Sequence, residues 1–179
     1  MTLTFKIILG VAIATVLGLI CMQFIDLGTT NEVVDNVTET TRLSIGISGF
    51  VVSPGKFLLD EGATMQDLID KAGGVNDRAD TRCFFPTATV NANEDYYIPP
   101  RYDPADICGT AEIQKVNINS YTDPEALTYI EDIGIAISKS ILSFREEHGE
   151  FKTLESIKQV NGIGQATYTR LRNYIMLKD

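Results

Sequence analysis

An apolar run covers residues 7–25 and contains no charged residue and one strongly polar side chain, Gln23. At about 1.5 Å per residue in a helix, a run of this length nearly spans the ~30 Å hydrocarbon core of a bilayer. Lys6 precedes the run and Asp26 and Glu32 follow it, so we expect residues 1–6 in the cytoplasm and the bulk of the chain outside. The alternative is a cleaved signal peptide, but the run is long and lacks a small-residue cleavage site. The pattern favours an uncleaved transmembrane helix.

Residues 26–41 are rich in threonine, asparagine and acidic side chains and show neither a helical nor a strand period. Such a composition buries little apolar surface and predicts an extended, flexible linker. The pattern then changes, because apolar and polar residues alternate over 43–48 as they do in a strand. Further extended runs are expected over 56–59 and 96–98.

A short amphipathic helix is expected between the second and third of these runs. Thr64 precedes residues 65–71, and Asp67 stands three positions after it, a spacing close to that of a capping box. The pair Gly73-Gly74 follows and favours the end of the helix. Residues 42–110 are therefore expected to form one small α+β domain.

This domain resembles the soluble-ligand-binding β-grasp family, known as SLBB. The resemblance implies a β-grasp fold that binds small molecules, polysaccharides or other proteins, and that can also drive self-association. The alternative is a spacer with a small core and no ligand. The matching residues are Gly49, 53–57, 62–64, 67–69, 72–74, 79–80 and 97–99.

Two segments of residues 111–179 share one layout, a short helix, a tight glycine-containing hairpin and a longer helix. The hairpins cover 130–134 and 160–164, so the repeat is offset by 30 residues. The longer helices are expected from Ile135 to His148, ending at Gly149, and from Gln165 to about Met176. An all-α tandem domain follows from this pattern.

The hairpins suggest a chemistry for the domain. Glycine lets a backbone turn tightly and approach another molecule closely. The amide groups of such a turn and of the helix after it have no internal partners, and together with the helix dipole they favour an anion such as a DNA phosphate. Contacts to phosphate carry no sequence information, so binding would be non-specific. Ile163 is expected to point inward and hold the second turn.

The repeat is similar to the helix-hairpin-helix family, and the whole architecture resembles the ComEA family of membrane-bound DNA receptors of competence. The resemblance implies that the protein holds double-stranded DNA outside the cell membrane and passes it to an uptake channel. Its matching residues are 116–119, 125–127, Ile133, Gly134, Ile141, 144–149, 151–153, 160–164 and Leu171. The expected DNA contacts are Asn161, Gly162, Ile163, Gly164, Gln165, Ala166, Arg170, Lys158, Ile133, Gly134 and Lys139.

Charge qualifies this expectation. The net charge of the chain is −9, and residues 111–179 hold eight basic and ten acidic side chains. Glu131 and Asp132 occupy the first hairpin, where each would repel a phosphate by roughly 1 kcal/mol. A basic face then requires Lys139, Lys158, Arg170 and Arg172 to gather on one side, and binding is expected to be weak and sensitive to salt. The alternatives are an anchored adhesion or assembly module that contacts a protein partner, and a saccharide- or small-ligand-binding protein.

Composition argues against catalysis and against a metal site. His148 is the one histidine, there are three cysteines, and no nucleotide or flavin motif is present, so we expect no enzyme activity, no metal and no cofactor. Cys83 and Cys108 both fall in the part expected outside the membrane, where a disulfide is permitted. The expectation is a Cys83–Cys108 bridge, and the alternative is two buried free thiols.

Overall fold

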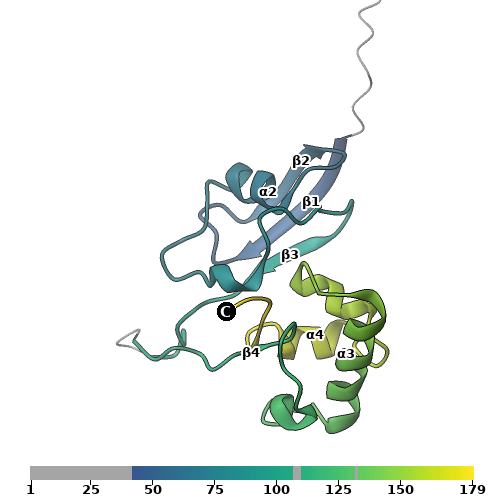
Figure 1. Cartoon of the computed structure of the whole chain (residues 1–179). Helices are drawn as coiled ribbons and strands as arrows, with labels where there is room; N and C mark the ends of the chain where they lie inside the picture. The colour runs from purple at the N-terminus through teal and green to yellow at the C-terminus, as the bar shows by residue number, and fades with distance from the viewer. Residues whose placement is uncertain (1–41, 107–109, 132) are drawn as a thin grey trace, which may run out of the picture. The chain divides into compact units, whose positions relative to one another are not determined.

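The computed structural model describes residues 42–106, 110–131 and 133–179, which belong to one compact unit, Thr40–Asp179 (Figure 1). The expected anchor at 7–25 and linker at 26–41 lie outside these residues. Within the described part of the chain, none of the helices has the length and apolar character needed to cross a membrane.

A three-stranded sheet with one helix forms the first half of this unit (Figure 1). Strand β1 (Arg42–Gly49) is central, pairing antiparallel with β2 (Gly55–Asp60) and parallel with β3 (Asp95–Ile98). Alternation along β1 places Ile45 and Ile47 in the core, as the sequence predicts. The α+β class of this half is confirmed.

Helix α2 (Met65–Lys71) packs on this core with Met65, Leu68 and Ile69 buried. The Asp67 amide donates to Thr64 Oγ1 at 3.3 Å, and the Thr64 amide donates to Asp67 Oδ2 at 2.8 Å. These two bonds satisfy helix-end amides reciprocally, so the predicted capping box is confirmed.

The second half contains α3 (Ile135–His148) and α4 (Gln165–Leu171), each preceded by a short 3-10 helix, η2 (Pro124–Leu127) and η3 (Leu154–Gln159). Another 3-10 turn, η1 (Thr81–Cys83), lies in the first half. Gly149 ends α3 with φ of +85°, as the sequence predicts.

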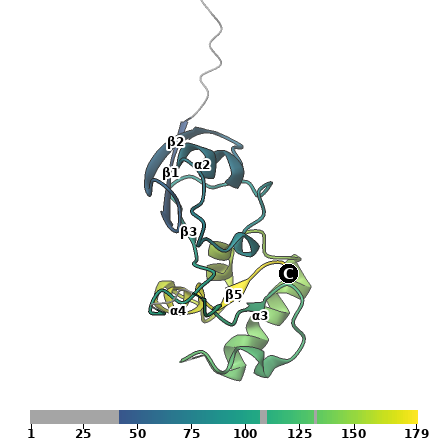
Figure 2. The same cartoon turned by 90° about the vertical axis from the view of Figure 1, so that its left-hand side faces the viewer.

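The prediction of an all-α domain with a helix up to Met176 is wrong. Helix α4 ends at Leu171, and the chain continues into β5 (Ile175–Met176), which pairs parallel with β4 (Val116–Asn117) and leads to the C-terminus (Figure 2). The Val116 amide donates to Tyr174 O and the Ile118 amide to Met176 O, each at 2.9 Å. This pairing joins the two ends of the domain and supplies backbone hydrogen bonds that a longer helix would have to replace.

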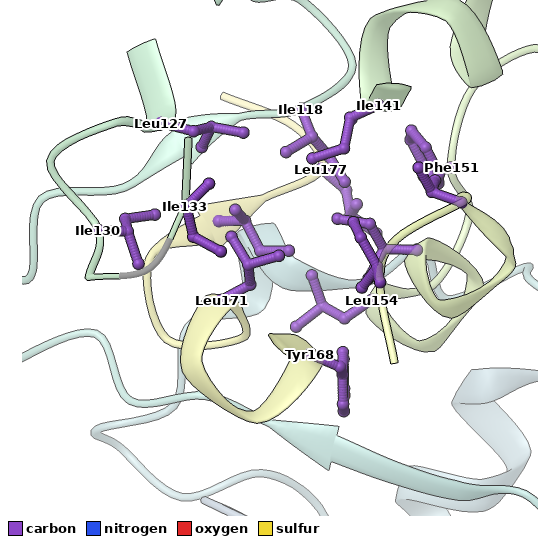
Figure 3. Close-up of a cluster of buried hydrophobic side chains, with 14 of the residues drawn as sticks. Ile118, Leu127, Ile130, Ile133, Ile141, Phe151, Leu154, Tyr168, Leu171 and Leu177 are labelled. Carbon is purple, nitrogen blue, oxygen red and sulfur yellow. The ribbon is translucent and has the colours of Figure 1, made fainter. Parts of the chain in front are cut away.

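The repeat is visible in the core of this half (Figure 3). Residues 30 positions apart are buried alike: Leu127 and Ile157 are both 0% exposed, and so are Ile141 and Leu171. The hairpin residues Ile133 and Ile163 are also buried, which confirms the inward position predicted for Ile163. Burial at equivalent positions shows that both repeats contribute to a single shared core.

A buried carboxylate links the two halves. Glu155 Oε1 accepts a hydrogen bond from the Tyr97 amide of β3 at 2.8 Å and from the Tyr168 hydroxyl of α4 at 2.7 Å. Burial raises the pKa of Glu155 to about 7 from its ordinary 4.5, although both donors oppose that rise. Beside it, Lys158 forms an ion pair with Glu94.

A second buried ionic group lies near the start of the helical half. Lys115 Nζ approaches Asp80 Oδ2 at 2.9 Å, and the side chains of both residues are 1% exposed. Arg82 adds two further hydrogen bonds to the same carboxylate. These partners hold the pKa of Asp80 at about 2, below its usual value, despite burial. The charge is therefore retained in the core because it is paired.

The predicted Cys83–Cys108 disulfide is wrong for the structure, because Cys83 is a free, buried thiol. Its side chain belongs to the core of the helical half, where Sγ lies 3.5 Å from Ile175 O and 3.6 Å from Lys115 Nζ. Cys108 lies outside the described residues. A thiol buried in this core is not available for a disulfide, and the sequence does not reveal that burial.

Cys83 is expected to be inert towards thiol reagents in the folded protein. Burial raises its pKa to about 12, so very little of the reactive thiolate forms at neutral pH. Iodoacetamide labelling with mass mapping, with and without denaturant, measures this reactivity at each cysteine. Equal labelling of Cys83 in both conditions would contradict its sealed position.

Candidate nucleic-acid interface

The second hairpin is a tight turn at residues 160–164. The Ile163 amide donates to Val160 O at 3.0 Å, and Ile163 is 4% exposed, so the apolar side chain anchors the turn to the core. Gly162 has φ of +90°, a left-handed conformation that favours glycine. Asn161, Gly162, Gly164, Gln165 and Ala166 are exposed around this anchor.

Glycine at the two helix starts is not required by the fold. Gly134 and Gly164 are the N-caps of α3 and α4, each with φ of −89°, which any residue adopts. A Cβ added at either position would meet no protein atom within 4 Å. Neither cap forms a side-chain hydrogen bond, so the first helical amides remain open to an outside acceptor.

Each hairpin lies beside the longer helix of the other repeat. A cleft of about 310 Å³ joins Asn161 of the second hairpin to Lys139, Ser140 and Ser143 of α3. The equivalent cleft of about 400 Å³ joins Glu131 of the first hairpin to α4 and the residues after it. It is lined by Tyr129, Glu131, Thr169, Arg170, Asn173 and Tyr174 among others.

The predicted basic cluster is divided by this arrangement. Lys139 and Arg170 line the two clefts, on α3 and α4 respectively. Lys158 instead pairs with Glu94 and lies 5.5 Å from the centre of the Tyr168 ring. Arg172 stacks 3.7 Å above the Tyr97 ring. Lys158 and Arg172 are thus engaged by residues of the first half or of the core. Of the four predicted cations, Lys139 and Arg170 line a cleft, and Arg170 is itself engaged by another group.

Lys139 is the cation best placed for a ligand of the second hairpin. It is exposed on α3, and no hydrogen bond or ion pair within the described residues engages it. Ser140 and Ser143, on the same wall, add hydroxyl groups. Glu147 also lines this cleft, so the positive charge of Lys139 stands beside one negative charge. The open amides of the hairpin, the small polar side chains and Lys139 together are still suited to phosphate oxygens.

The described residues of the first hairpin repeat one backbone hydrogen bond of the second hairpin but differ from it in their side chains. The Ile133 amide donates to Ile130 O at 3.0 Å, as its counterpart Ile163 does to Val160. At equivalent positions, however, Glu131 stands where Asn161 stands in the second repeat, and Thr169 where Lys139 stands. This cleft has a carboxylate where the other has an amide side chain, and its cation, Arg170, is already engaged by another group, so it is the poorer phosphate site.

The structure thus brings together part of the predicted site. Asn161 shares a cleft with Lys139, Arg170 lines the cleft that reaches Glu131 of the first hairpin, and Lys158 lies apart. Neither Ile133 nor Gly134 lines the cleft of Arg170. Sequence reasoning missed Ser140, Ser143 and the crossing of hairpin and helix between repeats. The 30-residue offset was the sequence signal for the missed residues. It makes Lys139 equivalent to Thr169 and Ser143 equivalent to Asn173, so the two longer helices can be compared position by position. Among the described residues there is no cluster of ligating side chains for a metal ion.

Comparison with known proteins matches two families along the chain. A model of the SLBB domain matches residues 44–91, and a model of the helix-hairpin-helix motif matches residues 111–176. These are the two domain types that the sequence resembles, in the same order.

Three relatives are similar to the chain to different extents. ComE operon protein 1 of Bacillus subtilis is 29% identical over 169 residues, covering 87% of this chain and 82% of that protein. An uncharacterized protein of Haemophilus influenzae is 37% identical over 62 residues, 35% of this chain and 55% of that protein. The human endonuclease/exonuclease/phosphatase family domain-containing protein 1 is 34% identical over 61 residues, 34% of this chain but 10% of that protein. The present chain has an SLBB domain followed by a helix-hairpin-helix domain, and it is similar to the Bacillus protein over most of its length. These findings show that the chain is a ComEA-type protein.

Proposed function

We propose that this protein is a membrane-anchored receptor that binds double-stranded DNA non-specifically outside the cell and passes it to an uptake channel in natural transformation. The observation that carries the proposal is the second hairpin, whose exposed glycines leave its backbone open and whose Asn161 shares a cleft with Lys139, a lysine with no ion pair within the described residues. The helix-hairpin-helix match over 111–176 supports the same reading.

Binding rests on the phosphate backbone. The amides at Gly164 and Gln165 donate to phosphate oxygens, and Lys139 adds a charge from the neighbouring repeat. Nothing in this cleft is arranged to read base edges, so all duplex sequences bind alike. With one strong hairpin and few free cations, a single copy binds weakly, and several copies held together at a membrane would gain avidity.

The anchor completes the proposed role. The apolar run at 7–25 holds the protein in the cell membrane with residues 1–6 in the cytoplasm. The linker at 26–41 then lets the helix-hairpin-helix domain search for DNA near the membrane surface. Delivery to a channel requires a DNA-bound receptor that stays at the membrane, and this architecture supplies one.

Salt titration of duplex binding tests the proposal. The Thr40–Asp179 unit should bind a random-sequence duplex with an affinity that falls linearly on a log–log plot against salt. Lys139→Ala should weaken binding several-fold and reduce the magnitude of the slope by about 1, because one phosphate contact is lost. Lys56→Ala, an exposed lysine on β2, is the control and should change neither. Absence of wild-type binding at low salt, with the protein folded, would overturn the proposed function.

A further inference from the structure

The cleft between the first hairpin and α4 differs from its counterpart in a way that phosphate binding does not explain. Tyr129 and Tyr174 at its wall are 49% and 40% exposed, unusually open for large aromatic residues in this protein. Their ring centres lie 6.4 Å apart at an angle of 88°. The equivalent repeat positions hold Gln159 and Phe144, and of these two Phe144 alone lines the cleft of the second hairpin.

A second cleft continues this surface around Tyr174. This cleft measures about 420 Å³ and is bordered by Asp103 and Glu112. It shares Asn173 and Tyr174 with the cleft between the first hairpin and α4. Glu131 and Asp103 thus approach the aromatic pair from both sides. Arg170 lines the first cleft but is itself engaged by another group, and Glu112 is paired with Arg101. Acidic groups exceed basic ones along this surface, so a phosphate is disfavoured and a cation favoured.

An unsatisfied acceptor lies between the two clefts. Asn173 Oδ1 is buried and has no hydrogen-bond partner within the described residues. A buried acceptor without a donor costs free energy, and because this oxygen is closed to solvent, a ligand's N–H group reaches it only after the Asn173 side chain turns towards the clefts. The surface itself offers an aromatic pair and two carboxylates.

We propose that this aromatic–acidic surface, formed by Tyr129, Glu131, Asp103, Asn173 and Tyr174, docks a protein segment that presents an arginine side chain. A guanidinium stacks on aromatic faces, donates up to five hydrogen bonds and pairs with carboxylates, which matches each feature of the surface. Lysine has the charge without the planar fork or the stacking face. A nucleotide would also stack, but it would bring a phosphate towards Glu131 and Asp103. The two repeats thus serve different partners, the second hairpin DNA and the first a protein.

A capped peptide, Gly-Ser-Arg-Ala-Gly with a fluorescent label, tests this assignment by fluorescence polarisation against the full chain in an uncharged detergent. Its match with citrulline in place of arginine keeps the shape and removes the charge. The arginine peptide should bind saturably, and the citrulline peptide about tenfold more weakly, since charge-assisted pairing is lost. Glu131→Gln should weaken arginine-peptide binding about fivefold, whereas Glu147→Gln, an exposed acid in the counterpart cleft, should leave it unchanged.

Several results would overturn the proposal. Equal binding of the two peptides, equal losses in the two glutamate variants, or no saturable binding at millimolar peptide would each do so. Displacement of the peptide by a single-stranded oligonucleotide, with the displacement abolished in Tyr174→Leu, would assign the surface to nucleic acid instead. Because the readout is peptide binding, failure of this proposal is distinguishable from failure of duplex binding.

Discussion

Replacing Gly164 with alanine is expected to weaken duplex binding about tenfold or more while leaving the fold intact. The added methyl group meets no protein atom, and φ of −89° suits any residue, so the cost in folding free energy is only a few tenths of a kcal/mol to about 1 kcal/mol. On the outer side, however, the methyl group stands where a phosphate must approach the open amides. Loss of one charge-assisted hydrogen bond, about 1.5–3 kcal/mol, corresponds to at least a tenfold change in affinity.

Two matched variants make this experiment decisive. Gly55→Ala adds the same methyl group into open space on β2, and should affect neither folding nor binding. Gly134→Ala changes the equivalent cap of the first repeat and should have a smaller effect, because Glu131 already disfavours phosphate there. Circular dichroism establishes that all three are folded, and duplex affinity at fixed salt is then compared. Equal affinity of Gly164→Ala and wild type would remove the second hairpin from the interface.

The sequence predicted correctly those features that depend on interactions between residues close together in the chain. The capping box of Thr64 and Asp67, the end of α3 at Gly149 and the inward Ile163 all depend on residues a few positions apart, and all are confirmed. The strands β4 and β5 escaped prediction because each contains two residues and pairs with a segment at the opposite end of the domain. Tertiary packing stabilises these strands, and the periodicity of a sequence does not report tertiary packing.

The candidate site was predictable in its backbone and not in its charges. The Ile-Gly pairs, repeated 30 residues apart, located both hairpins. Of the three hairpin glycines, Gly162 has the left-handed conformation that favours glycine, whereas Gly134 and Gly164 do not. Which cations face a ligand depends on long-range partners instead: Lys158 is drawn to Glu94 and Arg172 to Tyr97, residues more than sixty positions away. Of the four predicted cations, Lys139 and Arg170 line the clefts, and each lies beside the hairpin of the other repeat.

Glu155 is another charged residue whose environment depends on distant partners that the sequence does not reveal. Its burial leads to a prediction about stability. In the sequence it resembles an ordinary solvent-exposed acid at the start of a helix, yet it is 5% exposed and accepts hydrogen bonds from Tyr97 and Tyr168. Glu155→Ala is expected to lower the free energy of unfolding by about 2–4 kcal/mol at pH 5, because two buried donors lose their acceptor. Glu150→Gln, an exposed acid five positions away, should have little effect.

The pH dependence of this effect distinguishes a buried acid from a mere packing defect. The pKa of Glu155 is raised from 4.5 to about 7 in the folded state, so between these values the folded state binds more protons than the unfolded state. The contribution of Glu155 to stability is therefore complete below about pH 4.5, falls as pH rises, and is lost above about pH 7, a change of roughly 3 kcal/mol. Glu155→Gln keeps the acceptor oxygen without the charge, so its stability should be nearly constant over this window and should equal or exceed that of wild type at pH 8.

Urea unfolding of the Thr40–Asp179 unit at pH 5, 6, 7 and 8 measures this dependence. If wild type and Glu155→Gln changed in parallel across these pH values, the titrating group would lie elsewhere, and the link between β3 and the helical half would rest on neutral hydrogen bonds alone.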